Sequence, residues 1–430
     1  MGKFSATRFF AQASPGPQVP SPERKLLSGR TSYWHAVAVC LIALACFSSG
    51  AHLSAQTPRK APNAASFATL SAQADAARDA DRLDEAIALY RRALALRPSW
   101  AEGLWSLATI YYDRDAYDNA ALNFQKLIAQ QPQNGTAYAM LGLCEFELKH
   151  DALALRHIQK GESLGLQKNP DLRQVVLYHE GMLLQRKGSF QAAQDTLEQL
   201  CLQAGPSDNA AATLGMTMLR MSFAKPPASG SPDYDVVMRV GRAECLVGQK
   251  KYDEARPVYD QIVKDYPDYV NVHYAYGLFL IELRDVAGSV EQFKQEIANH
   301  PDDLISRLRI AAVEYKQDSA VGIPYAEQAV RMAPQQAFGH YLLGLLRLDV
   351  DDYANAIPEL EIAEKGMPKE AKIYLALGTA YSRAGRKQDA NRARATFQRL
   401  NEEAQKSVGA KLPTEEDAAR VPVGDAPSPQ

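Results

Sequence analysis

The chain has 430 residues, with 48 lysines and arginines against 50 aspartates and glutamates and a formal net charge of −2. Its hydrophobic content of 46% is enough for a large core, and the near-neutral charge argues against a nucleic-acid-binding protein, which normally carries a basic excess. Five cysteines are too few for a disulfide-rich scaffold, and a mean hydropathy of −0.30 is compatible with one membrane segment but not with several.

The first 55 residues have the organisation of an export signal. Residues 1–32 form a basic tail, expected to be flexible, and twelve apolar residues follow from Ala36 to Phe47 before a stretch of small residues. This order predicts a secretory signal peptide over 33–55, cleaved after Ala51 or Ala55, with a linker over 56–65. An uncleaved signal anchor is the alternative, because about 20 residues are enough to cross a bilayer.

Either form exports the rest of the chain across the inner membrane. The cleaved form would be periplasmic or extracellular, and the anchored form would hold residues 56 onward outside while contacting the membrane only through 33–55. A soluble helix buried in a cytosolic protein is a third interpretation of the same segment.

Regularly spaced prolines mark an internal repeat. Pro98 and Pro132 are 34 residues apart, and four later prolines follow one another at intervals of 34, 33 and 34: Pro267, Pro301, Pro334 and Pro368. Each proline closes a stretch rich in alanine, leucine and tyrosine that is interrupted once near its middle. The unit is therefore predicted to be two amphipathic helices with a tight turn between them and a proline after the second helix.

These units resemble the tetratricopeptide repeat (TPR) family, whose 34-residue pattern places leucine, glycine and tyrosine on helix A and alanine, an aromatic residue and proline on helix B. The second unit fits best, with Leu104, Leu107, Ala108, Tyr111, Ala120, Phe124, Leu127 and Pro132. Nine units lie in near-register, although the seventh, from Leu304 to Pro334, matches poorly. The resemblance implies an all-α fold, a right-handed α-solenoid of about nine helix-turn-helix repeats.

The expected domain organisation follows from the repeats. Repeats 1–4 cover 66–206, a linker helix with a Pro/Gly/Ser loop covers 207–235, repeats 5–9 cover 236–405, and a disordered polar tail covers 406–430. The linker helix, which includes Leu214 and Met218, is expected to continue the stack. Its alternative role is a methionine-rich docking surface, since methionine suits adaptable contacts.

No catalytic motif is present in the sequence. It has no phosphate-binding glycine loop, no His-Glu-x-x-His, no Cys-x-x-Cys and no Gly-x-Ser-x-Gly. We therefore expect no catalytic residues, no cofactor and no metal. The three cysteines that follow the signal region, Cys144, Cys201 and Cys245, are interpreted as small core residues, and a structural disulfide among them is not expected.

The resemblance implies that the A helices line a concave groove. The second, fifth, ninth, twelfth and thirteenth positions of each A helix point inward, and acids outnumber bases there, which favours a partner with apolar or aromatic anchors and some positive charge. The predicted groove residues are Glu102, Trp105, Tyr112, Asp113, Phe146, Tyr178, Arg186, Tyr274, Ile281, Phe338 and Tyr341. The alternative is that Trp105, Tyr112 and Tyr274 only pack on their neighbours.

Some TPR proteins hold a carboxylate at the end of a partner with lysine and asparagine at inner positions. The corresponding positions in the first repeats are Ser71, Asp75, Ser106, Thr136 and Met140, so this clamp is not expected here.

These observations predict a non-enzymatic TPR scaffold or adaptor of the cell envelope that binds other proteins or peptide segments through its groove, and no nucleic acid. An envelope enzyme subunit and a soluble cytosolic TPR adaptor are the alternatives. The sequence does not predict the oligomeric state.

Overall fold

The structure is a computed structural model that describes residues 62–166, 170–205, 207–221 and 226–408. The predicted export segment at 33–55 lies outside these residues, as does the tail from 409 onward. Among the described residues, no helix combines the length and the apolar character needed to cross a bilayer.

All regular secondary structure in the described part of the chain is helical, as predicted. In chain order the helices are α2 (Pro62–Asp79), α3 (Leu83–Leu96), α4 (Ala101–Asp113), α5 (Tyr117–Gln130), α6 (Gly135–Glu147), α7 (Asp151–Leu164), α8 (Pro170–Lys187), α9 (Phe190–Ala204), α10 (Asp208–Met218), α11 (Tyr234–Gly248), α12 (Tyr252–Asp265), α13 (Val272–Glu282), α14 (Val286–Asn299), α15 (Leu304–Glu314), α16 (Ser319–Met332), α17 (Ala337–Asp349), α18 (Tyr353–Gly366), α19 (Ala371–Arg383) and α20 (Lys387–Val408). The first helix thus begins inside the stretch expected to be a linker, and the last continues to Val408, past the expected start of the tail.

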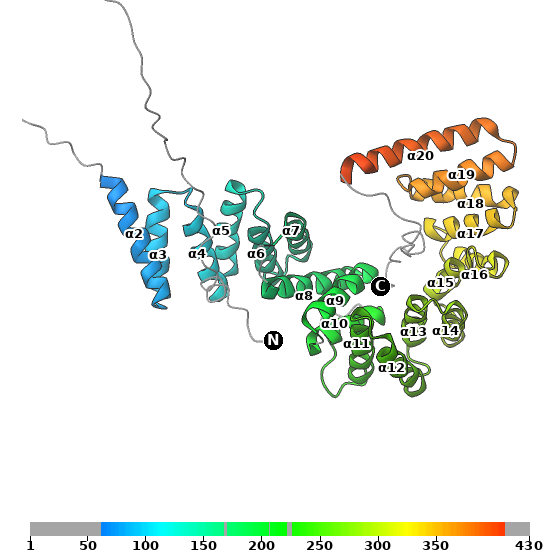
Figure 1. Cartoon of the computed structure of the whole chain (residues 1–430), viewed down its shortest axis with the longest axis horizontal. Helices are drawn as coiled ribbons and strands as arrows, with labels where there is room; N and C mark the ends of the chain where they lie inside the picture. Colours follow the sequence, from blue (N-terminus) through cyan, green and yellow to red (C-terminus); the bar gives the residue numbers. More distant parts are fainter. Residues whose placement is uncertain (1–61, 167–169, 206, 222–225, 409–430) are drawn as a thin grey trace, which may run out of the picture. The chain divides into compact units, whose positions relative to one another are not determined.

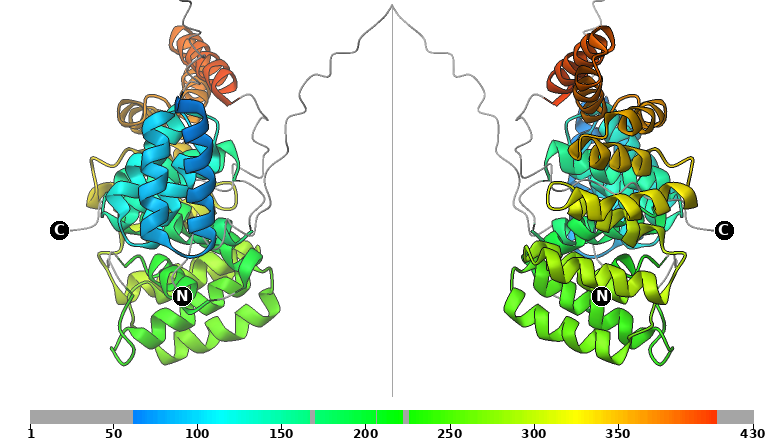
Figure 2. Two further views of the ribbon diagram at one scale, coloured as in Figure 1. Left: turned by 90° about the vertical axis from the view of Figure 1, so that its left-hand side faces the viewer. Right: turned by 90° about the vertical axis from the view of Figure 1, so that its right-hand side faces the viewer.

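The chain divides into two compact units at residue 148. The N-terminal unit holds α2–α6 and the C-terminal unit holds α7–α20. In the N-terminal unit α2 and α3 lie side by side (Figure 2) and bury Ala74, Ala77 and Tyr90 between them and α4. Tyr90 donates to Asp75 at 2.6 Å and accepts from Arg78 at 3.0 Å, so its hydroxyl is satisfied at the edge of the core.

In the C-terminal unit the helices from α13 to α19 follow one another in chain order (Figure 1), each packed against the next, and α17 also contacts α15 and α19. The poorly matching seventh repeat also forms a helix pair, α15 and α16, whose core residue Leu308 is fully buried. Asp303 accepts from the backbone of Ile305 and Ser306 and so caps the first turn of α15.

The turn inside each helix pair contains one residue in the left-handed backbone region. Glycine occupies this position at Gly188 and Gly385, but elsewhere it is a residue with a side chain, such as Arg284 with φ +59° or Lys316 with φ +72°. This conformation costs an L-residue about 1–2 kcal/mol. The tight turn is therefore imposed by packing of the two helices and not by local preference.

The inserted helix α10 packs against α11 at a close crossing of two backbones. A Cβ atom built on Gly215 would lie 1.9 Å from the carbonyl oxygen of Val237, and one built on Gly241 would lie 1.7 Å from that of Ala211. Leu214 is fully buried and Met218 is 1% exposed. These side chains are not available to a partner, so α10 continues the helical stack and is not a methionine-rich docking surface.

A disulfide joins Cys201 on α9 to Cys245 on α11, with Cα atoms 5.3 Å apart. The expectation that all three cysteines are buried holds, since Cys144, Cys201 and Cys245 are at most 1% exposed. The expectation that no disulfide forms was wrong. The second helix of a repeat packs on the first helix of the next one elsewhere in the chain, as α16 does on α17, and α9 and α11 keep this contact although α10 is inserted between them in the sequence.

Candidate functional site

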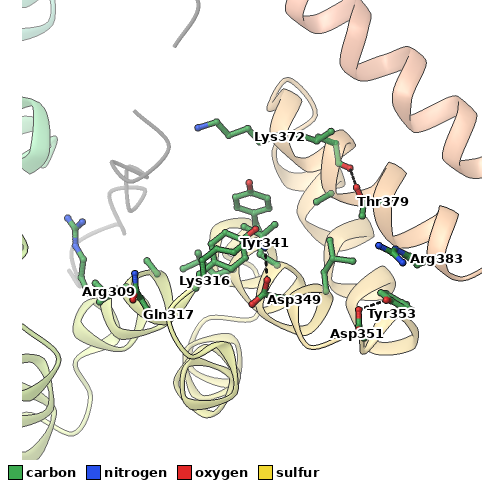
Figure 3. Close-up of a pocket in the computed structure, with 18 of the residues that line it drawn as sticks. Arg309, Lys316, Gln317, Tyr341, Asp349, Asp351, Tyr353, Lys372, Thr379 and Arg383 are labelled. Carbon is green, nitrogen blue, oxygen red and sulfur yellow. Dashed lines mark hydrogen bonds and ion pairs between the residues drawn. The ribbon is translucent and has the colours of Figure 1, made fainter. Parts of the chain in front are cut away.

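The C-terminal unit contains a cavity of about 920 Å³, which we call the inner cavity (Figure 3). It lies along α13, α15, α17 and α19, the A helices of successive repeats, and includes the turns after α15 and α17. Its lining residues are Ile281, Val286, Arg309, Ala312, Val313, Tyr315, Lys316, Gln317, Tyr341, Leu342, Leu345, Leu348, Asp349, Asp351, Tyr353, Lys372, Leu375, Ala376, Thr379 and Arg383.

Helical spacing explains which residues of α17 face the cavity. Tyr341, Leu345, Leu348 and Asp349 are the fifth, ninth, twelfth and thirteenth residues of α17, and all four line the cavity. Side chains three and four residues apart lie on the same face of a helix, so the pattern selects one stripe. The stripe is the one that the repeat pattern predicts to point inward.

Residues at nearly the same helix positions of α19 also line the cavity. Lys372, Leu375, Thr379 and Arg383 are its second, fifth, ninth and thirteenth residues, and all line the cavity. Leu375 is 49% exposed and leaves apolar surface open inside the cavity. Lys372 and Arg383 lie near opposite ends of this stripe (Figure 3).

The cavity carries four bases and two acids, and both acids already have hydrogen-bond partners. Asp349 accepts from the ammonium of Lys316 at 2.6 Å and from the hydroxyl of Ser319 at 2.7 Å, and these bonds lower its pKa below the ordinary value. Asp351 accepts from the hydroxyl of Tyr353. The predicted excess of acids over bases at inner positions therefore does not hold in this cavity.

Three cations of the cavity remain without an ion-pair partner among the residues that the structure describes: Arg309, Lys372 and Arg383. Arg309 donates to two neutral groups, the side-chain oxygen of Gln191 and the hydroxyl of Tyr274, each at 3.3 Å. Its Nε is buried without a hydrogen-bond partner. The inner cavity thus combines an apolar floor with uncompensated positive charge.

Two of the predicted groove residues, Ile281 and Tyr341, line the inner cavity together. Two others in the C-terminal unit, Tyr274 and Phe338, are 2% and 7% exposed and lie outside its lining. Tyr274 packs against Phe293, with ring centroids 5.9 Å apart, as the packing alternative expects for that residue.

The remaining predicted residues of the C-terminal unit lie on α8. Tyr178 is 8% exposed, and Arg186 is paired with Asp151 at 3.3 Å. The inner cavity does not include either residue.

The predicted groove residues of the N-terminal unit lie on α4 and α6. Glu102 is exposed, whereas Trp105 and Asp113 are half-buried. Trp105 contacts the ring of Phe124 edge-on, with centroids 5.5 Å apart. Tyr112 and Phe146 are buried, with only 8% and 7% of their surfaces exposed. Of the aromatic residues predicted here, Trp105 is the one that keeps substantial surface open to a partner.

Among the described residues, no group of three or more histidine, cysteine, aspartate or glutamate side chains is arranged to hold a metal ion. The apolar and cationic lining of the inner cavity suits binding of another molecule by burial and charge pairing.

A family model described as a tetratricopeptide repeat matches residues 71–135, 107–162, 241–303 and 341–400, which together make up half of the chain. The chain is a tetratricopeptide repeat protein. The TPR matches fall on both sides of α10, and the last one covers α17 from residue 341 onward and all of α19. TPR proteins are protein-interaction scaffolds, so the partner of this TPR protein is expected to be another protein.

Solved structures of MamA proteins are similar to parts of this TPR protein. One described as "MamA 41-end from Desulfovibrio magneticus RS-1" is 22% identical, with 40% of this chain and 96% of that chain covered and a TM-score of 0.36. Another, "MamA RS-1 ArsTM double mutant", is 20% identical over 39% of this chain and 96% of that chain, with a TM-score of 0.37. No curated protein matches the chain.

Proposed function

We propose that this TPR protein is a non-enzymatic scaffold of the cell envelope that holds a segment of a partner protein in its inner cavity. The observation that carries the proposal is the cavity itself, in which the A helices of four successive repeats present exposed apolar surface beside cations without ion-pair partners. A partner segment that buries this surface would remove apolar area from water and place charge next to the free cations.

Two features support a location beyond the inner membrane. The first is the order of basic tail, apolar run and small residues over 1–55. The second is the disulfide between Cys201 and Cys245, because disulfides persist in oxidising compartments and are rare in the cytosol.

Thiol trapping in cells tests the location. Cells are quenched in acid and treated with a large maleimide reagent, and the protein is examined by gel electrophoresis with and without prior reduction. We expect the reagent to reach Cys201 and Cys245 only after reduction. Labelling of both without reduction would contradict export. The mass of the mature N-terminus then separates a cleaved signal, with a start between Ala51 and Gln56, from an anchor with residues 1–55 intact.

Affinity capture from an envelope extract tests the binding surface. The full chain is compared with Leu375→Gln in the inner cavity and with the matched control Ile362→Gln on α18, since Ile362 is 41% exposed and does not line the cavity. We expect a protein that the wild type and Ile362→Gln capture and Leu375→Gln loses. Equal capture by all three, with unchanged circular dichroism, would contradict binding in the cavity.

A further inference from the structure

We propose that the segment held in the inner cavity is an acidic one from a partner protein: an extended stretch with two carboxylate side chains about four residues apart and an apolar side chain midway between them, all on one face. This inference rests on the proposed function and specifies the chemistry of its ligand. The proposed ligand is negatively charged, whereas the excess of acids at inner positions of the whole repeat array favours a ligand with some positive charge.

The spacing comes from α19. Lys372 and Arg383 are eleven residues apart, which is close to three full turns, so both point to the same side of the helix. Eleven residues at 1.5 Å each place their Cα atoms about 16 Å apart along the axis. An extended segment rises about 3.3 Å per residue and only every second side chain points to the same face, so carboxylates four residues apart lie about 13 Å apart on one face. The long side chains of lysine and arginine can cover the remaining distance.

The preference for an acidic ligand comes from which charged side chains of the cavity already form ion pairs and which do not. Lys316 is already bonded to Asp349, so this base and this acid largely cancel. Lys372, Arg383 and Arg309 have no carboxylate within ion-pair distance among residues 62–408 as far as the structure describes them. A partner carboxylate would therefore meet cations that no acid of the described chain has neutralised, and a basic segment would meet net repulsion.

The apolar element comes from Leu375, which lies between the two cations on the same stripe. It is 49% exposed in the free protein, and Leu345 and Leu348 of α17 line the same cavity. A leucine or phenylalanine of the partner placed midway between the two carboxylates would cover Leu375. Charge at both ends with apolar contact in the centre also fixes the register of the bound segment.

Peptide binding measured by fluorescence anisotropy tests the proposal with the full chain. The probe is an eleven-residue peptide, blocked at both ends, with two glutamates four positions apart and a leucine midway, so that all three side chains point to one face when the peptide is extended. The matched peptides carry two glutamines or two lysines in place of the glutamates. We expect the glutamate peptide to bind at least tenfold more tightly than either one at moderate salt.

A variant with reversed charges in the cavity tests the proposal most directly. The variant Lys372→Glu/Arg383→Glu should lose at least tenfold affinity for the glutamate peptide and gain affinity for the lysine peptide. Lys369→Glu is the control, because Lys369 is exposed on the turn before α19 and does not line the cavity, and its affinities should stay within about twofold of wild type. Equal binding of all three peptides, or an unchanged preference in the double variant, would overturn the proposal.

The C-terminal tail of the chain is the alternative ligand of the inner cavity, because its residues 414–417 are Thr-Glu-Glu-Asp and are therefore acidic. A chain ending at Val408 provides the test. Similar peptide affinity with and without the tail supports a ligand from a partner. Binding that is absent in the full chain and present only in the shortened one would overturn the partner assignment. If affinity capture identifies a cavity-bound partner without an acidic segment, the inference fails while the proposed function stands.

Discussion

Cys201 and Cys245 are bonded to each other across an inserted helix, so α9 and α11 are held together although α10 separates them in the chain. The bond closes a loop of 44 residues that contains all of α10. It therefore restrains the one place in the C-terminal unit where the regular alternation of helix pairs is interrupted.

The first prediction concerns this bond. The variant Cys201→Ser/Cys245→Ser should lower the free energy of unfolding of the C-terminal unit by about 4 kcal/mol, because the bond restricts the conformations of a loop of this length in the unfolded chain. Urea unfolding followed by circular dichroism measures the effect. Reductant should shift the wild-type midpoint towards that of the variant and leave the variant unchanged. A wild-type midpoint insensitive to reductant would contradict a stabilising role.

The second prediction concerns pH. Glu244 is 1% exposed, accepts from the amide of Gln194 at 2.7 Å and from the hydroxyl of Tyr259 at 2.5 Å, and shares this buried site with Glu198. Burial first, and then the neighbouring carboxylate, raise the pKa of Glu244 well above its ordinary value, and burial also raises that of Glu198. The folded state therefore retains protons that the unfolded state releases.

The sign of the pH effect follows from proton linkage. A group whose folded pKa is raised contributes stability that is complete below its unfolded pKa, near 4.5, and is lost as the pH rises through the folded pKa. The melting temperature should therefore fall between pH 5 and pH 8. Glu244→Gln, which cannot ionise, should flatten this dependence. The exposed control Glu402→Gln should keep the wild-type slope, and a Glu244→Gln slope equal to wild type would contradict the account.

Glu162 adds a second contribution of the same sign. Burial, followed by a hydrogen bond with the carboxyl of Glu180, raises the pKa of Glu162 to about 8. The slope that remains in Glu244→Gln should be smaller still in Glu162→Gln/Glu244→Gln. Differential scanning calorimetry at several pH values provides the measurement. Additivity of the two changes is expected because they lie at different helix contacts.

The third prediction concerns the backbone crossing between α10 and α11. Gly241→Ala should destabilise the C-terminal unit by about 3 kcal/mol, since its Cβ would lie 1.7 Å from a carbonyl oxygen and the two helices would have to separate. Gly339→Ala on α17 is the control. The nearest atom to its Cβ is 3.6 Å away, so the higher helix propensity of alanine should leave stability unchanged or raise it by up to about 1 kcal/mol. Equal tolerance of both substitutions by chemical denaturation would argue against the close crossing.

The fourth prediction uses the left-handed turn residues. Arg284→Gly should raise stability by about 0.5 kcal/mol, because it removes an unfavourable φ of +59° at an exposed position at the cost of a more flexible unfolded chain. Gly385→Ala, with φ +77°, should lower it by about 1 kcal/mol. Thermal unfolding of both variants gives the comparison, and changes of the same sign would contradict this explanation of the turns.

The sequence was sufficient to predict the helical repeat and the family, because proline spacing and small residues at helix crossings are local signals. Position rules for helix A also selected Ile281 and Tyr341, which both line the inner cavity. The same rules, applied to the ninth repeat, select Lys372, Leu375, Thr379 and Arg383. The predicted groove residues come from the second to the eighth repeats, so these four residues of the ninth repeat were missed.

Other features depend on packing between distant segments. Nothing in the spacing of Cys201 and Cys245 indicates that α9 and α11 are in contact, because the insertion breaks the repeat between them. The amino-acid composition also does not show that the carboxylate of Asp349 already accepts hydrogen bonds from Lys316 and Ser319. The expected excess of acids referred to the inner positions of all nine repeats, whereas the inner cavity lies along four of them and is lined by four bases and two acids.

Site-specific photo-crosslinking in living cells tests the central claim most directly. A photoreactive amino acid is introduced at Leu375 inside the inner cavity, and at Ile362 on α18 as the equally exposed control. The account predicts that Leu375 yields a discrete cross-linked partner band that Ile362 does not, and that Lys372→Glu/Arg383→Glu abolishes it. Cross-links at Ile362 with none at Leu375 would contradict the inner cavity as the binding surface.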